Sequence, residues 1–291
     1  MIGARLWAGW TSSVRPASKA LTTEKMPIVT CSTITFDGLR RFIEEFVAAE
    51  PTHPCHPGVW QTPLVAASPV DERFDALTRI GMPDHLHPRE LLPSARSVVV
   101  FFVPFSRDVA RANRQGDRPS RDWGVAYTRT NDLINRLSQS LARLMEAHGW
   151  HCGLTPATHN FNEEKLMARW SHRHLGDLVN LGRFGVNRML ITPAGCVGRL
   201  GSLVTDAGLG DHPLIQTREA CLLKAGKPCG RCIDICPVKA ISTGGFDRRR
   251  CWNRLKDNRD TLADFADLPA RTHVCGKCTV MLPCSFANPV E

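Results

Sequence analysis

The feature that most restricts this chain is a run of closely spaced cysteines near its C-terminal end. Eight of its twelve cysteines lie between residues 221 and 284. Within that segment, two residues separate Cys229 from Cys232, three separate Cys232 from Cys236, and Pro237 follows directly. Disulfide frameworks are typical of short secreted chains, whereas this chain has 291 residues and concentrates its thiols in one segment. The pattern therefore predicts metal ligation in a reducing compartment.

The spacing favours two [4Fe–4S] clusters over zinc. Zinc ribbons use two C-x2-C pairs for each metal. This chain has only two such pairs, Cys229/Cys232 and Cys275/Cys278. Dicluster ferredoxins use C-x2-C-x2-C-x3-C-P, in which the fourth cysteine ligates the other cluster. Because proline fixes φ and biases the preceding residue away from helix, Pro237 suits a turn at which Cys236 leaves its neighbours. Structural zinc is the alternative that the sequence leaves open.

This crossed pattern divides the eight cysteines into two predicted ligand sets. The standard spacing would place the first ligand at Gly226, so the nearest upstream thiol, Cys221, is expected to return to the cluster through the loop "LLKAGKP". The predicted ligands are Cys221, Cys229, Cys232 and Cys284 for cluster I, and Cys236, Cys251, Cys275 and Cys278 for cluster II. The remaining thiols, Cys31, Cys55, Cys152 and Cys196, are expected to be small buried apolar residues.

The charge of the chain agrees with an anionic cofactor. The formal net charge is +9, and residues 218–291 hold 13 Lys or Arg against 8 Asp or Glu. Basic surroundings stabilise a reduced cluster and raise its potential, although an ordinary solvated surface would look the same. The longest basic run is Arg248–Arg250, without interleaved aromatic residues, so nucleic acid is not expected as the main partner.

The longest uncharged apolar stretch is also short. It begins at Ser97 and covers nine residues, against the roughly 20 that a membrane-spanning helix needs, so it is predicted to be a buried strand. No membrane association and a cytoplasmic location are expected. Residues 1–25 are predicted to be a disordered or extraneous extension, with Met26 as the true start, or else a transit-type segment.

Residues 26–211 are predicted to form an α/β layered domain and residues 212–291 a ferredoxin-like module. Helical spacing of apolar residues predicts helices at 37–50 and 130–149, and one or two more within 163–182. Residues 51–95, rich in Pro and His, are expected to be irregular. The stretch 188–195 is expected to be a strand and turn.

The order of several motifs resembles the epoxyqueuosine reductase and reductive dehalogenase group of iron–sulfur oxidoreductases. These motifs are "LLPSARSVVVFFVPF", "WSHRHLGDLVNLGRFG", "NLGRFGVNRMLITPAG" and the eight-cysteine tail, and together they cover roughly residues 90–291. The resemblance implies a nitroreductase-like α/β domain that binds cobalamin, fed with single electrons by a 2[4Fe–4S] module. Where the resemblance implies an acidic proton donor, this chain has His159 and Asn160, and Asn180 stands in place of a glycine.

Other candidate site residues lie outside the cysteine segment. Tyr127, the only tyrosine, is expected at a helix start, as a proton donor or a packing residue. His159, His172 and His174, with Arg173, could bind an anionic cofactor or donate protons, or form an exposed polar face. Gly182, Gly185 and Gly201 could allow close approach of a cofactor, or serve as turn residues.

Two functions follow from these predictions. In the first, the chain is an enzyme in which two [4Fe–4S] clusters pass electrons to a corrinoid, or less favourably a flavin, that reduces a small organic substrate. In the second, it is an electron carrier with no cofactor in the N-terminal domain, and it reduces a partner protein. Both require a low-potential electron donor of the ferredoxin or flavodoxin type.

Overall fold

The computed structural model describes residues 34–51, 58–158 and 161–291 of the chain. Residues 33–291 form one compact unit. The predicted N-terminal extension, Cys31, Cys55 and the candidate His159 lie outside the described residues. No helix in the described part is both long and apolar enough to cross a membrane.

A four-stranded antiparallel sheet, in the order β1-β2-β8-β3, lies at the centre of this unit. Strand β2 (Ser97–Pro104) is buried along its whole length between β1 (Leu64–Pro69) and β8 (Gly198–Thr205). Strand β3 (Cys152–Leu154) pairs with the other side of β8. The predicted strand at β2 is confirmed. Strand β8 was not predicted, because its glycines interrupt the apolar pattern.

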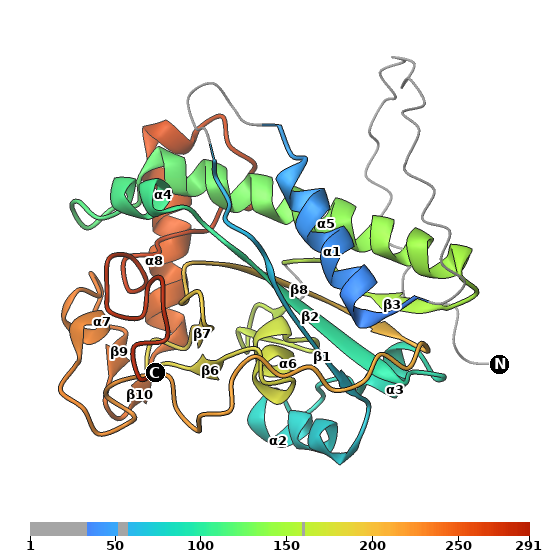
Figure 1. Cartoon of the computed structure of the whole chain (residues 1–291). Coiled ribbons are helices and arrows are strands. Elements are labelled where there is room, and N and C mark those ends of the chain that lie inside the picture. Colours follow the sequence, from blue (N-terminus) through green and yellow to red (C-terminus); the bar gives the residue numbers. More distant parts are fainter. Residues whose placement is uncertain (1–33, 52–57, 159–160) are drawn as a thin grey trace. The chain divides into compact units, whose positions relative to one another are not determined.

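Both faces of the sheet are covered by helices (Figure 1). The odd-numbered side chains of β2 from 99 to 103 pack with α1 (Phe36–Ala48) and α5 (Arg121–Ala147). Its even-numbered side chains from 98 to 102 pack with α6 (His172–Leu178) on the opposite face. A strand buried on both faces needs no polar alternation, which explains the continuous apolar sequence of β2.

Helix α5 begins earlier than its sequence pattern indicated. Ser120 caps the helix by accepting a hydrogen bond from the Trp123 backbone N–H at 3.3 Å. Tyr127 therefore lies well inside the helix, and its predicted position at a helix start is wrong. The helix continues through Gly124, a weak helix former, because the Phe265 side chain packs directly against that position. Tertiary packing thus overrides local propensity here.

Two further sequence predictions need correction. Residues 51–95 are less irregular than expected, because they contain β1 and three short helices: η1 (Glu72–Ala76), α2 (Leu77–Ile80) and α3 (Pro88–Leu91). Of the stretch 163–182, predicted to hold one or two helices, only α6 is helical, because a hairpin of β4 (Phe161–Asn162) and β5 (Met167–Ala168) precedes it. Both errors involve elements too short to show a clear period.

The cysteine-rich segment packs against the α/β layers through its own short elements. These are α7 (Arg231–Asp234), β9 (Ile241–Ser242), β10 (Gly245–Phe246), α8 (Arg248–Thr261) and η2 (Ala263–Phe265). Phe265, Val274 and Val280 share an apolar cluster with Phe105 and Trp123 from the upstream part. The remaining elements are α4 (Arg107–Ala112), β6 (Arg183–Phe184) and β7 (Leu190–Ile191), and the last confirms the strand expected near 190.

Candidate metal centres and cofactor face

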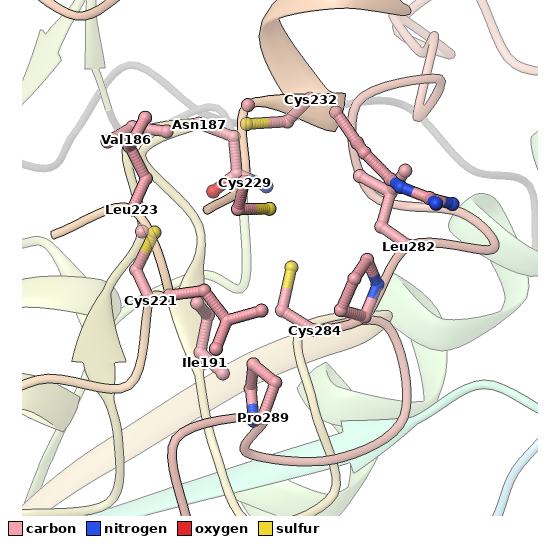
Figure 2. A pocket seen from close by; sticks show the side chains of 15 residues that line it. Val186, Asn187, Ile191, Cys221, Leu223, Cys229, Cys232, Leu282, Cys284 and Pro289 are labelled. Carbon is pink, nitrogen blue, oxygen red and sulfur yellow. The ribbon is translucent and has the colours of Figure 1, made fainter. Parts of the chain in front are cut away.

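The four cysteines predicted for cluster I line one pocket. Cys221, Cys229, Cys232 and Cys284 are among its lining residues, together with the apolar side chains of Val186, Ile191 and Leu282. In Figure 2, the side chains of Cys229, Cys232 and Cys284 converge on a common space, and Cys221 lies beside Leu223 at its edge. We call these four cysteines the cluster I group. The structure thus brings together thiols that lie up to 63 residues apart in the sequence.

The four cysteines predicted for cluster II also lie near one another. Cys236 packs in one apolar cluster with Cys251 and Cys278. Cys275 adds to the electrostatic surroundings of both Cys251 and Cys278. We call Cys236, Cys251, Cys275 and Cys278 the cluster II group. Cys232 of the cluster I group belongs to the same apolar cluster as Cys236, so the two groups adjoin.

The thiol pKa values reflect the same grouping. Burial, with smaller contributions from Cys284, Cys221 and Cys229, raises the pKa of Cys232 to about 12. Burial also raises the pKa of Cys251 to about 12, with added contributions from Cys275 and Cys236. Buried thiolates that repel one another need a cation among them, so this donor set fits a metal cofactor that holds several thiolates at once.

The spread of the thiols bears on the kind of metal site. Within the described residues, no three His, Cys, Asp or Glu side chains lie close enough to bind a single metal ion. Tetrahedral zinc, with Zn–S bonds of about 2.3 Å, requires sulfur atoms roughly 3.8 Å apart. A four-iron cube holds its cysteines at separate corners and spreads them around a larger volume. The described cysteines thus do not form a ready-made site for a single metal ion.

Cys196 is a neighbour of cluster I that the sequence pattern missed. It is buried, as expected, but its backbone N–H donates to the Cys284 carbonyl oxygen at 3.0 Å. The two thiols are also hydrogen-bonded, which raises the pKa of Cys196 and lowers that of Cys284. Gly195 makes this approach possible: its φ is +80°, and a Cβ atom there would lie 2.3 Å from the Ser285 backbone. Nothing in the cysteine spacing indicated this contact.

The cluster II group is tied to the loop before α5. Asn113 is fully buried, and its amide donates to the Cys275 carbonyl oxygen at 2.9 Å. The side-chain oxygen of Asn113 accepts a hydrogen bond from the Ser120 backbone N–H at 2.9 Å. Lys277 lies within the second C-x2-C pair and is only 1% exposed. Its ammonium group donates to the backbone oxygens of Asn113 and Gln115 at 2.7 and 2.6 Å. Sequence spacing gave no sign of this clamp.

Tyr127 and Arg199 form a second polar group, on α5 and β8. Tyr127 is 9% exposed, and its hydroxyl lies 3.2 Å from the Thr158 hydroxyl. The Arg199 guanidinium stacks over the tyrosine ring at 4.3 Å from the centroid. Burial lowers the pKa of Arg199, and its Nε atom is buried without a hydrogen-bond partner. A buried cation with a free donor atom is suited to an anionic group.

His172 is fully occupied by protein contacts. Its Nδ1 lies 2.8 Å from the Ser202 hydroxyl, which itself accepts from the Trp170 indole N–H at 3.0 Å. Its Nε2 lies 3.2 Å from the Pro156 carbonyl oxygen, a geometry in which Nε2–H donates. Burial lowers the pKa of His172 to about 4, so the ring is neutral at pH 7. The structure therefore gives His172 a positioning role between α6 and the sheet.

Arg173 behaves differently from its neighbour. Its side chain is exposed, and it donates to the Arg188 carbonyl oxygen at 2.7 Å without an ion pair among the described residues. Surrounding protein lowers the pKa of Arg173, with further lowering by Arg199, whereas the Cys251 thiol raises it. Burial also lowers the pKa of nearby His174 to about 4. The charge of Arg199 and the Cys251 thiol thus both act on Arg173.

The three glycines predicted to border a cofactor instead lie close to other atoms of the protein. A Cβ on Gly182 would meet the Ile191 carbonyl oxygen of β7 at 2.6 Å, and one on Gly185 would meet the Asn187 side chain at 2.6 Å. A Cβ on Gly201 would lie 2.3 Å from the Phe101 ring. These glycines are required for hairpin and sheet packing. Their cofactor role stays a prediction from the resemblance alone.

The chain is similar in sequence to epoxyqueuosine reductases, and its fold resembles those of epoxyqueuosine reductases and reductive dehalogenases. Two curated relatives are epoxyqueuosine reductases, which are enzymes, from Bacillus cereus and Bacillus anthracis. The first is 26% identical over 210 residues, which cover 68% of this chain and 50% of the relative. The second is 26% identical over 211 residues, with the same coverage. The chain thus spans about half the length of these relatives. No protein-family model matches the sequence.

Solved structures of epoxyqueuosine reductases and a reductive dehalogenase have folds similar to that of this chain. An epoxyqueuosine reductase from Bacillus subtilis has a TM-score of 0.50 at 16% identity, covering 84% of this chain and 64% of that one. An epoxyqueuosine reductase with a modified tRNA stem loop has a TM-score of 0.51 at 16% identity, covering 86% and 64%. A catabolic reductive dehalogenase in complex with 3-bromo-4-hydroxybenzoic acid has a TM-score of 0.52 at 14% identity, covering 78% and 30%.

Proposed function

We propose that this chain is an iron–sulfur reductase with two [4Fe–4S] clusters and a corrinoid bound near Tyr127, Arg173 and Arg199. The observation that carries this proposal is the pocket lined by all four cysteines of the cluster I group. These thiols come from separate parts of the chain, and apolar residues surround them. The cluster II group adjoins them, which supports electron transfer between two clusters in one module.

The cofactor would supply one-electron reduction of a bound substrate. The residues of the chain would position that substrate and donate a proton to it. Arg199 and Arg173 would bind an anionic group of the cofactor or substrate, since neither has an ion-pair partner among the described residues. Tyr127 could donate a proton from its hydroxyl, with Thr158 orienting that hydroxyl and Arg199 stabilising the negative charge left on the oxygen. His172 would hold α6 against the sheet.

The positions of the charges support an order for the electron path. Cys251 of the cluster II group is close enough to Arg173 for each to affect the pKa of the other. Arg173 in turn is affected by Arg199, which stacks on Tyr127. The cluster II group would therefore hold the cluster that supplies electrons on the side of Arg173 and Tyr127.

Anaerobic purification and reconstitution test this proposal directly. We expect about eight iron atoms and eight labile sulfides per chain, from two four-iron clusters. A stable content near four iron atoms would remove one cluster, and a colourless zinc protein would contradict the proposal. Titration with cobalamin, followed by absorbance and calorimetry, then tests the cofactor. Arg173→Ala should weaken binding, whereas Arg143→Ala, on the exposed far part of α5, should not. A fully loaded protein that does not bind cobalamin would favour the electron-carrier function instead.

The substrate class has one further candidate. The sequence argued against a nucleic-acid partner, but that expectation must be relaxed, because one structural neighbour holds a tRNA stem loop. The net charge of +9 is compatible with such a partner. Binding of a tRNA stem loop, measured across a range of salt concentrations, distinguishes this candidate from a small organic substrate. A steep loss of affinity with salt would support it.

A further inference from the structure

Part of the protein surface beside the cluster I group is open. Gly226 and Gly230, on either side of Cys229, have no protein atom within 4 Å of the position that a Cβ would occupy. Cys229 itself is partly exposed, and the Arg231 side chain lines the same pocket as the four cysteines. The described part of the chain therefore leaves this side of the pocket uncovered.

An exposed apolar residue lies on this surface. Among the described residues, only three large apolar side chains are exposed: Ile80, Leu214 and Ile235. Ile235 is 37% exposed and directly precedes Cys236. Its backbone N–H donates to the Arg231 carbonyl oxygen at 3.0 Å, so Ile235 and Arg231 lie one helical turn apart on one face. Ile235 thus presents an apolar side chain to solvent one helical turn from Arg231.

The charges around Ile235 are mostly positive. Between residues 222 and 240, the ionic side chains are Lys224, Lys227, Arg231, Lys239 and a single carboxylate, Asp234. All five are exposed. Lys224 is neutralised by Glu219 at 2.7 Å, whereas Lys227 and Arg231 have no ion pair among the described residues. This surface is thus an apolar centre with a basic rim, the usual anatomy of a small protein interface.

We propose that this surface, formed by Lys227, Arg231 and Ile235, docks an acidic electron-transfer protein that reduces cluster I. The inference rests on the proposed function, because it requires a cluster in the pocket. In each encounter the donor centre loses one electron and cluster I gains it, and no covalent bond or proton changes place. Positive charge steers an acidic donor toward the cluster and speeds the encounter, while Ile235 packs against its apolar surface.

Stopped-flow reduction of the reconstituted protein tests the proposal, with a reduced plant-type ferredoxin as the protein donor and dithionite as the small reductant. We expect the rate with ferredoxin to fall steeply with ionic strength. At low salt, the double variant Lys227→Glu with Arg231→Glu should be reduced about tenfold or more slowly. Ile235→Ser should have a smaller effect that does not depend on salt. The control Arg143→Glu, a charge reversal on α5, should match the wild type.

The outcomes separate this proposal from the function on which it rests. Iron content and reduction by dithionite should be the same in all variants, which shows that the clusters are intact. If the wild type forms no clusters, the proposed function fails. If clusters form but ferredoxin does not reduce them, or reduces every variant at the wild-type rate, the docking surface is wrong and the clusters stand.

Discussion

The cluster I group and the cluster II group hold the same number of thiols in contrasting surroundings. The cluster I group lines a pocket with mainly apolar residues, and the one charged side chain in that lining, Arg231, is exposed, so water screens its charge. The cluster II group has an ammonium group, Lys277, buried within its own C-x2-C pair, and the guanidinium of Arg173 close to Cys251. The cation beside the cluster I group is thus solvated, whereas Lys277 beside the cluster II group is buried.

This contrast indicates a direction for electrons. Positive charge stabilises the reduced form of an anionic cluster and raises its reduction potential. Cluster II should therefore have the higher potential, and cluster I should be the entry point. The same comparison shows how each group is anchored: the cluster I group through the turn at Gly195, and the cluster II group through Asn113. The following predictions test the contrast.

Loss of a ligand should have the largest effect. Cys229→Ser should abolish the EPR signal of cluster I and lower the iron content from about eight atoms to about four, leaving cluster II. Cys251→Ser and Cys236→Ser should both abolish the other signal, because Cys236 is expected to cross to cluster II. A common signal lost in Cys236→Ser and Cys229→Ser would show that the two groups are divided incorrectly.

The anchor of the cluster I group should be nearly as sensitive. Gly195→Ala places a Cβ 2.3 Å from the Ser285 backbone at a φ of +80°. Gly116→Ala is the matched control, because its φ is +62° and no protein atom lies near its Cβ position. Both substitutions place alanine in the left-handed region, which costs about 1–2 kcal/mol of stability. Only Gly195→Ala adds a steric clash. Chemical denaturation should show the larger loss in Gly195→Ala, with cluster I released first. Equal losses would argue against the anchor.

The charge of Lys277 should separate the two potentials. Lys277→Met removes the buried cation, so the midpoint potential of cluster II should fall by tens of millivolts, with about 59 mV for each tenfold change in a one-electron equilibrium. Cluster I should shift much less. EPR-monitored redox titration measures both, with Lys256→Met, an exposed lysine of α8, as the control. Equal shifts in both clusters would remove Lys277 as the source of the contrast.

Replacement of Cys196 should have the smallest effect, and it should change the midpoint potential of cluster I. A thiol is a weak hydrogen-bond donor, and a donor to a cluster sulfur raises the potential. Cys196→Val should lower the midpoint potential of cluster I slightly and leave cluster II unchanged. Cys196→Ser, which keeps a donor, should not lower it. Loss of cluster I iron in Cys196→Val would instead mark Cys196 as a ligand.

The sequence predicts the local features of this molecule far better than its long-range contacts. The cysteine spacings, the buried strand β2 and helix α1 follow from patterns within a few residues, and the structure has each of them. The apolar pattern of strand β8 is too weak to predict a strand, because Gly198 and Gly201 interrupt it. Both glycines are needed where the Phe102 and Phe101 rings cross the strand. No sequence period could reveal this, because the cause lies on the neighbouring strand.

The candidate site shows the same limit. His172 and Arg173 are adjacent in sequence and looked equivalent, yet one is buried between two hydrogen-bond partners and the other is exposed. The contacts of Lys277 and Asn113 join residues 164 positions apart. Such pairings depend on how the chain closes on itself, which spacing within a motif does not encode.

The shared apolar cluster around Trp123 also bears on how the protein is made. Trp123 leaves the ribosome about 140 residues before Phe265, and Phe105 about 160 residues before it, which is roughly ten seconds earlier at ordinary rates of translation. Until Phe265, Val274 and Val280 arrive, the nascent chain lacks the cover for that apolar surface. Completion of the fold and completion of the cysteine groups therefore fall in the same final stretch of synthesis, and a chain stalled before residue 265 would be a ready substrate for chaperones.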